Sequence, residues 1–190
     1  MSDKSERRKR IRREKRRQRR KERSFKRTAR TFFGWLLSIL IAVVLGYGVV
    51  SYCFQTVYVV GDSMSPVCVN QNKVTVNKLC YLIGSPDRYD VVAYRSVDTP
   101  DAYYDIKRVI GLPGETVQIK DGKVYINDKE LTDTPFSDYI FTAGLAENPI
   151  TLADDEYFLL GDNVNNSEDS RFLKVGNVKK AEILGRIKKR

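Results

Sequence analysis

The chain has 190 residues, a formal net charge of +10, three cysteines and no histidine. This length is typical of one domain with appendages. Without histidine the chain cannot supply a Ser-His-Asp triad by itself. Because it also lacks a Cys-x-x-Cys motif, we expect no metal site.

The positive charge is concentrated at the N-terminus. Residues 1–30 hold 17 of the 34 Lys and Arg side chains but only 4 of the 24 Asp and Glu, so the remaining 160 residues carry 17 basic and 20 acidic side chains. Such a basic run binds RNA or anionic lipid in some proteins, and beside a membrane span it fixes the orientation. We favour the orientation role, which is compatible with contact to anionic lipid, and expect no nucleic-acid partner.

An uncharged stretch follows the basic tail. No charged residue lies between Arg30 and Asp62, and residues 32–50 are an apolar run of 19 residues. A helix of this length spans the roughly 30 Å of a bilayer's hydrocarbon core. A cleavable signal peptide has a shorter apolar region and a small-residue cleavage site, and a buried soluble helix rarely stays uncharged for so long. We therefore predict a single-pass anchor at residues 31–54, between a cytoplasmic tail at 1–30 and an extracytoplasmic domain at 55–190.

Beyond the span, short runs rich in Val, Ile and Tyr alternate with turn residues. Seven of them predict strands: residues 55–60, 72–79, 89–95, 104–111, 115–120, 123–127 and 156–161. Asp121-Gly122 predicts a two-residue hairpin turn, because both central positions of a type I′ turn need positive φ. No helix-period segment of useful length follows residue 55. The expected fold is mainly β: an all-β extracytoplasmic domain behind one N-terminal transmembrane helix.

Ser63, in "GDSMSP" (61–66), is a candidate nucleophile. A serine needs a base to become nucleophilic, and this chain matches neither G-x-S-x-G nor S-x-x-K. A lysine whose pKa is lowered by burial is the remaining base. Taken alone, Gly-Asp-Ser is better explained as an ordinary turn.

Lys107 is the candidate base, because it lies in the predicted strand 104–111 among apolar residues. The period of two puts Lys107 and Arg108 on opposite faces, so at most one of them is expected to be forced inward. Taken alone, Lys107 would be a solvated edge residue, since lysine is rarely buried.

A third segment, "GDNVNNSEDSR" (161–171), follows the last predicted strand. As an isolated feature it is a polar loop. Its side chains are almost all hydrogen-bonding, and Arg171 is available to pair with Asp162 or Asp169. Such a cluster is able to hold a neighbouring strand rigid beside a neutral lysine.

Together, "GDSMSP", "IKRVIGLPGE" and "GDNVNNSEDSR", in this order behind an apolar anchor, resemble the bacterial type I signal peptidases. These are membrane-anchored Ser/Lys proteases that remove signal peptides from exported preproteins. The resemblance covers most of residues 32–190, and it leaves the basic tail outside. It implies cleavage after Ala-x-Ala-like sites, with preprotein signal peptides as partners and no cofactor.

The resemblance also implies a role for individual residues. Ser63 is matched to the nucleophile, Lys107 to the general base and Ser167 to the serine that hydrogen-bonds the lysine amine. The Ser63 backbone N–H is one oxyanion donor, and Gly61, as in Gram-positive members, stands where other members have a serine as the second. The remaining matches are a supporting charge network of Asp162, Asp169 and Arg171, and shallow pockets lined by Val59, Val60, Met64, Cys68 and Ile106.

Three residues depart from the family pattern. Val67 replaces the Thr that usually follows Pro66, and Val164 replaces a common Arg. The third is Asp105, two residues before Lys107, where the family often has an apolar residue. A carboxylate there would raise the pKa of Lys107 and oppose its role as a base, so we expect Asp105 to reach solvent or a cation.

Two other hypotheses fit parts of the sequence. Self-cleaving SOS-type repressors also pair Ser with Lys, but they carry a DNA-binding domain where this chain has a membrane span. A catalytically inactive membrane-tethered scaffold, with an RNA- or lipid-binding tail, is the main alternative. Whether Cys68 and Cys80 form a disulfide is left open by the sequence.

Overall fold

The computed structural model describes residues 31–95, 104–136 and 139–187. The chain divides into two compact units, Met1–Val50 and Ser51–Arg190. The described part of the first unit belongs to the helix Thr31–Cys53, which has 23 residues and a mean hydropathy of 2.3, long and apolar enough to cross a membrane. Its side chains are exposed all round from Thr31 to Tyr52, as expected for a helix that contacts lipid. The basic tail lies outside the described residues.

The second unit is mainly β, as predicted. It also contains the short helix α2 (Leu79–Ile83) and two 3₁₀ helices, η1 (Gly144–Glu147) and η2 (Lys180–Glu182). Each of the seven predicted runs overlaps a strand, although the first strand begins one residue before the run 55–60 and the run 72–79 ends early because Leu79 begins α2. The strands are β1 (Phe54–Tyr58), β2 (Lys73–Asn77), β3 (Val91–Tyr94), β4 (Asp105–Gly111), β5 (Thr116–Lys120), β6 (Lys123–Ile126), β7 (Lys129–Glu130), β8 (Ile150–Thr151), β9 (Glu156–Leu160), β10 (Val178–Lys179) and β11 (Ile183–Ile187).

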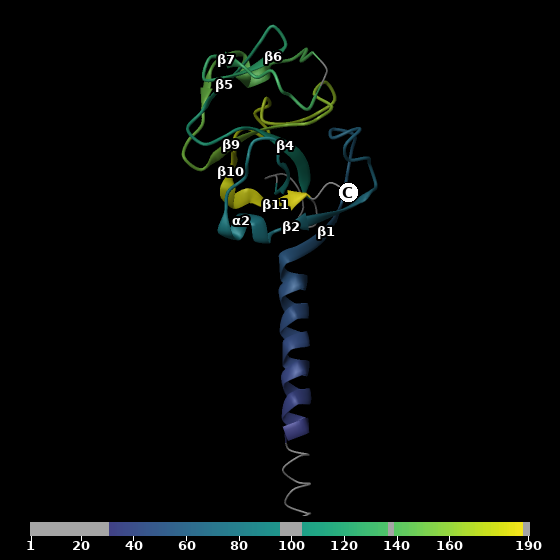
Figure 1. Cartoon of the computed structure of the whole chain (residues 1–190). Coiled ribbons are helices and arrows are strands. Elements are labelled where there is room, and N and C mark those ends of the chain that lie inside the picture. Colours follow the sequence, from purple (N-terminus) through teal and green to yellow (C-terminus); the bar gives the residue numbers. More distant parts are fainter. Residues whose placement is uncertain (1–30, 96–103, 137–138, 188–190) are drawn as a thin grey trace, which may run out of the picture. The chain divides into compact units, whose positions relative to one another are not determined.

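The strands form two sheets. One has seven strands in the order β1-β2-β11-β3-β4-β9-β10, and the other has four in the order β7-β6-β5-β8. Figure 1 shows β5, β6 and β7 at one end of this unit and β1, β2 and β11 at the other. The predicted turn between β5 and β6 is confirmed, with φ values of 46° at Asp121 and 69° at Gly122.

Four strands were not predicted: β7, β8, β10 and β11. The first three have two residues each, too short to show a period. β11 is a full strand that pairs with both β2 and β3, but Gly185 and Arg186 interrupt its apolar pattern. Gly185 has a packing reason, because a Cβ there would overlap the backbone oxygen of Asn77 in β2.

The central position of β4 in the larger sheet explains its burial. It pairs with β3 on one side and β9 on the other, and every residue after Asp105 is buried. Ile106 packs in one hydrophobic cluster and Val109 in another. A lysine placed in this strand is therefore removed from water on both faces of the sheet.

Candidate active site

The structure brings Ser63 and Lys107 together. The Lys107 Nζ donates a hydrogen bond to the Ser63 Oγ at 2.9 Å, across 44 residues of sequence. Ser63 lies half-buried in the turn that follows β1, where the Ser65 N–H donates to the Asp62 carbonyl oxygen. Lys107 is only 4% exposed. The two side chains therefore have the geometry that proton transfer between them requires.

The environment of Lys107 favours its neutral form. Burial lowers the pKa of Lys107 below its ordinary value, because desolvation penalises the charged ammonium. The carboxylates of Asp105, Asp169 and Glu168 act in the opposite direction, but desolvation is the largest effect and decides the sign. A neutral amine has a free electron pair that is able to accept the serine proton.

Asp105 faces the same cleft as Lys107. It is half-buried and lines a cavity of about 360 Å³ with Ser63, Lys107, Glu168 and Lys174. Of the three carboxylates that raise the pKa of Lys107, Asp105 has the largest effect. The opposing effect expected from the sequence is therefore present, and burial outweighs it.

The expectation that at most one of Lys107 and Arg108 is buried was wrong. Arg108 is 9% exposed and donates from Nε and Nη2 to the two carboxylate oxygens of Asp162, at 2.6 and 2.5 Å. Its Nη1 also donates to the Tyr89 carbonyl oxygen at 2.8 Å. Because β4 is covered on both faces, each side chain is turned into the protein, and Arg108 is accommodated by a buried carboxylate.

Arg171 pairs with Asp169 rather than with Asp162. Its guanidinium donates to the Asp169 carboxylate at 2.8 and 2.9 Å. The same side chain donates to the carbonyl oxygens of Thr142 and Val164, at 3.0 and 2.5 Å. Asp169 and Arg171 are almost fully buried, so their pair fixes the shape of the 161–171 loop from inside.

Asn163 is a residue that the sequence interpretation missed. Its backbone N–H donates to the Ser63 carbonyl oxygen at 3.0 Å, and its side-chain amide donates to the Asp62 carbonyl oxygen at 3.3 Å. These bonds tie the loop 161–171 to the turn that carries Ser63. The segment contains several asparagines, and nothing in their spacing distinguishes this one.

Ser167 lies beside the pair without bonding to the amine. Its Oγ is buried and has no hydrogen-bond partner among the described residues. A Cβ on Gly161 would overlap this Oγ and would lie 2.5 Å from the Ser63 carbonyl oxygen. Gly161 therefore allows the Ser167 side chain and the Ser63 backbone to approach each other closely.

The five predicted pocket residues divide into two groups. Val60 is 66% exposed and lines the cleft. The other four are buried in one hydrophobic cluster with Val57 and Val76: Val59, Met64, Cys68 and Ile106. Val164, which departs from the family pattern, is buried in the core of the smaller sheet.

Cys68 and Cys80 have different surroundings. Cys68 is in the buried cluster just described. The Cys80 thiol is half-buried in α2 and donates to the Asn77 carbonyl oxygen at 3.0 Å. No disulfide joins the two cysteines in the described part of the chain.

A β-rich fold with a serine hydroxyl bonded to a buried lysine is typical of peptidases that use a Ser/Lys pair. A family model described as signal peptidase, peptidase S26, matches residues 32–190. The chain belongs to this family, the resemblance to type I signal peptidases is confirmed, and the protein is a serine peptidase.

Named relatives agree with the family model. Signal peptidase I S of Bacillus subtilis is 37% identical over 154 residues, which are 72% of this chain and 77% of that protein. Signal peptidase I P of Bacillus subtilis subsp. natto is 33% identical over 169 residues, 84% of this chain and 89% of the relative. A crystal structure of a signal peptidase I from Enterococcus faecalis is 30% identical, with a TM-score of 0.46, and covers 54% of this chain and 97% of that one.

Proposed function

We propose that this membrane-anchored signal peptidase removes signal peptides from exported preproteins with Ser63 as nucleophile and Lys107 as general base. The observation that carries the residue assignment is the 2.9 Å hydrogen bond between a half-buried serine and a lysine that is 4% exposed. Family membership supports the reaction. Nothing in the fold or the comparisons favours an inactive scaffold.

The proposed chemistry is acyl transfer. Ser63 Oγ attacks the scissile carbonyl carbon as its proton passes to the neutral Lys107 amine. The C–N bond then breaks, and the Lys107 ammonium returns this proton to the leaving amine, which leaves an ester on Ser63. Water then attacks the ester carbonyl carbon and gives a proton to Lys107. As the bond between this carbon and the Ser63 Oγ breaks, Lys107 passes that proton to the Ser63 Oγ.

Neighbouring groups have supporting roles in this proposal. The Ser63 backbone N–H, which forms no hydrogen bond within the described residues, is one donor to the developing oxyanion. Ser167, whose buried Oγ has no hydrogen-bond partner among the described residues, is assigned to orient the lysine amine. Asp162, Asp169 and Arg171 hold the loop behind the pair.

The substrate is expected to present small side chains before the scissile bond, as in Ala-x-Ala-like sites. Val60 lies at the cleft, and the buried cluster of Val59, Met64, Cys68 and Ile106 begins beside it in the sequence. We expect these side chains to allow only shallow space, enough for alanine-sized groups. Larger residues would have to displace a packed core.

Processing of a purified preprotein by the full chain in detergent tests the residue assignment. Ser63→Ala and Lys107→Ala should each lower cleavage by about 10²–10⁴-fold, because each removes one partner of the proton transfer. Lys123→Ala, which breaks only the exposed pair with Glu130 in the smaller sheet, is the matched control and should keep most activity. Parent-like rates for both Ser63→Ala and Lys107→Ala would contradict the assignment.

The orientation is also proposed: the basic tail in the cytoplasm and residues after 55 outside, on one span. The support is the excess of Lys and Arg before the helix Thr31–Cys53. Protease added outside an intact cytoplasmic membrane, to cells whose outer envelope has been opened, should cleave the second unit. It should spare a tag at the N-terminus. Protection of the second unit would overturn this topology.

A further inference from the structure

Asp105 is a charged residue without a partner beside the proposed catalytic pair. Its side chain is half-buried and lines the cleft with Ser63 and Lys107. Among the described residues, none forms a hydrogen bond or an ion pair with its carboxylate. A carboxylate that is partly removed from water without a compensating donor is unfavourable. The proton transfer has no use for this charge, which raises the pKa of Lys107 and so disfavours the neutral amine.

The other charged groups of the cleft do not neutralise Asp105. Glu168 and Lys174 form an ion pair with each other at 2.9 Å. Asp62, the residue before the nucleophile, lines the cleft with an exposed side chain, and its carboxylate has no partner within the described part of the chain. When Lys107 is neutral, the cleft therefore carries a net negative charge. A cleft lined by one sign of charge raises the local concentration of groups of the opposite sign.

A buried tyrosine stands behind Asp105. Tyr94 in β3 pairs directly with Asp105 in β4, so the two side chains lie on one face of the sheet, which Lys107 shares. Tyr94 is 1% exposed, and its hydroxyl has no hydrogen-bond partner among the residues described. Burial raises the pKa of Tyr94, and of the charges that raise it further Asp105 has the largest effect. Two polar groups with unused hydrogen-bonding capacity therefore adjoin at this wall of the cleft.

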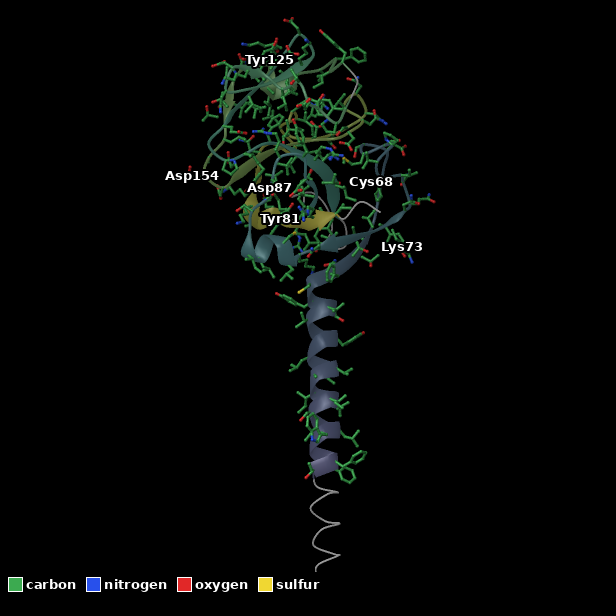
Figure 2. The ribbon with its side chains drawn as sticks, in the orientation of Figure 1. Cys68, Lys73, Tyr81, Asp87, Tyr125 and Asp154 are labelled. Atoms are coloured by element: carbon green, nitrogen blue, oxygen red, sulfur yellow. The ribbon has the colours of Figure 1, made fainter. Side chains whose placement is uncertain are left out.

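The apolar pocket residues lie on the other face of β4. Ile106 comes between Asp105 and Lys107, so it points to the opposite face, where it belongs to the buried cluster that contains Cys68. Cys68 is labelled in Figure 2, on the same side of the view as Lys73 of β2. An extended substrate peptide alternates its side chains in the same way. When the two small residues of an Ala-x-Ala-like site face this cluster, the side chain of residue x points away from it.

We infer that Asp105 selects preproteins that carry Lys or Arg as residue x, between the two small residues before the scissile bond. The inference rests on the proposed function, with Ser63 and Lys107 as the reacting pair. A substrate ammonium or guanidinium supplies the donors that the Asp105 carboxylate lacks. Its positive charge also offsets the carboxylate that opposes the neutral amine of Lys107. An acidic residue x would be repelled instead.

Cleavage of a matched substrate series by the full chain in detergent tests the inference. One preprotein carries Ala-Lys-Ala, Ala-Gln-Ala or Ala-Glu-Ala before the scissile bond. At low salt, and at a pH where Lys107 is neutral, kcat/KM should be about 10-fold higher for lysine than for glutamate, the size of one charge-assisted hydrogen bond. Asp105→Asn keeps the side-chain shape without the charge, and should bring this ratio below about threefold. Glu130→Gln, which removes an exposed carboxylate of the smaller sheet, is the matched control and should keep the parent ratio.

The ratio separates the inference from the proposed function. Asp105→Asn also changes the pKa of Lys107, but comparing two substrates with one variant cancels an effect on the base. In the parent, about 0.5 M sodium chloride should lower the ratio by screening. Asp105→Ser, with the same expectation, replaces Asp105→Asn if the latter fails to cleave the glutamine substrate.

Two results would overturn the selection by Asp105 and leave the proposed function standing. One is equal kcat/KM for the three substrates while cleavage still requires Ser63. The other is a lysine preference that persists unchanged in Asp105→Asn. Cleavage that does not depend on Ser63 would overturn the proposed function and the inference together.

Discussion

The pKa of Lys107 is set by two opposing effects, desolvation by burial and the charges of three nearby carboxylates. Burial lowers its pKa, while Asp105, Asp169 and Glu168 raise it, with burial the larger effect. The carboxylates therefore set how alkaline the medium must be before the amine is neutral. This balance between one strand position and its charged neighbours determines the pH range in which the proposed base works.

The first prediction concerns the pH dependence of cleavage. Activity needs neutral Lys107, so kcat/KM should rise with pH through a pKa below 10.5. Asp105→Asn removes the carboxylate that raises the pKa of Lys107 most, so the rising part of the pH profile should move to lower pH. Lys107→Arg should be inactive throughout, because arginine stays protonated. A flat profile that still depends on Ser63 would exclude the lysine-base mechanism.

The second prediction concerns the stability cost of the same lysine. Because its folded-state pKa is lowered, the unfolded chain binds more protons between that pKa and 10.5, and the free energy of unfolding rises with pH across this window. Lys107→Met should be more stable than the parent at low pH, with the difference shrinking toward pH 10.5. Thermal unfolding in detergent at several pH values measures it. A constant difference would mean that the ammonium is not penalised in the fold.

The third prediction concerns the buried pair of Arg108 and Asp162. Arg108→Ala leaves a carboxylate that is 2% exposed without its partner, and should cost about 3–5 kcal/mol. Cleavage should also fall, because Asp162 belongs to the loop bonded to Ser63. Lys123→Ala, which breaks the exposed pair with Glu130, is the control and should change stability far less. Equal effects of the two substitutions in urea unfolding would contradict the structural role.

At the scale of elements, β11 joins parts of the chain that are far apart. It lies between β2 and β3 in the sheet. It therefore joins the β1–β2 hairpin to β3 and, through β3, to β4, which carries Lys107. The turn bearing Ser63 lies between β1 and β2. Formation of the Ser63–Lys107 pair therefore depends on β11.

The fourth prediction concerns Gly185 in β11. Gly185→Ala places a methyl group against the Asn77 backbone, which is a less yielding neighbour than a side chain, and should cost about 1–3 kcal/mol. Arg186→Ala, one residue further on the same strand, removes an ion pair with Asp90 whose arginine is 46% exposed, and should cost less than about 1 kcal/mol. Thermal unfolding compares them. A harmless Gly185→Ala would mean that β2 and β11 are not closely paired.

At the scale of the whole molecule, charge and apolarity are separated along the chain. The first 30 residues hold 17 basic and 4 acidic side chains, the helix Thr31–Cys53 carries no charge, and the rest is mildly acidic. Each part thus suits a different medium: an anionic membrane surface, hydrocarbon and water.

The fifth prediction concerns the basic tail. Deletion of residues 2–25 should leave kcat/KM on a preprotein in detergent within about twofold, because the Ser63–Lys107 pair is formed wholly by residues 63–107 and the loop 161–171. The same deletion should lower the fraction of chains that insert into the membrane in the predicted orientation. Loss of detergent activity would assign the tail a direct part in catalysis.

The sequence by itself determined the features that depend on neighbours along the chain. The span follows from uncharged length, most strands from runs of Val, Ile and Tyr, and the turn at Asp121-Gly122 from its two residue types. The identity of Ser63 and Lys107 as a pair came from a resemblance over three separated segments. Strand period could not reveal that Arg108 is also buried, because it records which face a side chain is on and not whether both faces are covered.

The tertiary structure decided which distant groups meet. From the sequence, Arg171 could pair with either Asp162 or Asp169. In the fold Arg171 pairs with Asp169, and Asp162 pairs with Arg108, 54 residues away in the sequence. Asn163 contacts the turn of Ser63 only because the segments that follow β1 and β9 meet in the folded unit. The physical reason is range: a hydrogen bond acts over about 3 Å, so it depends on packing of whole strands that no local pattern records.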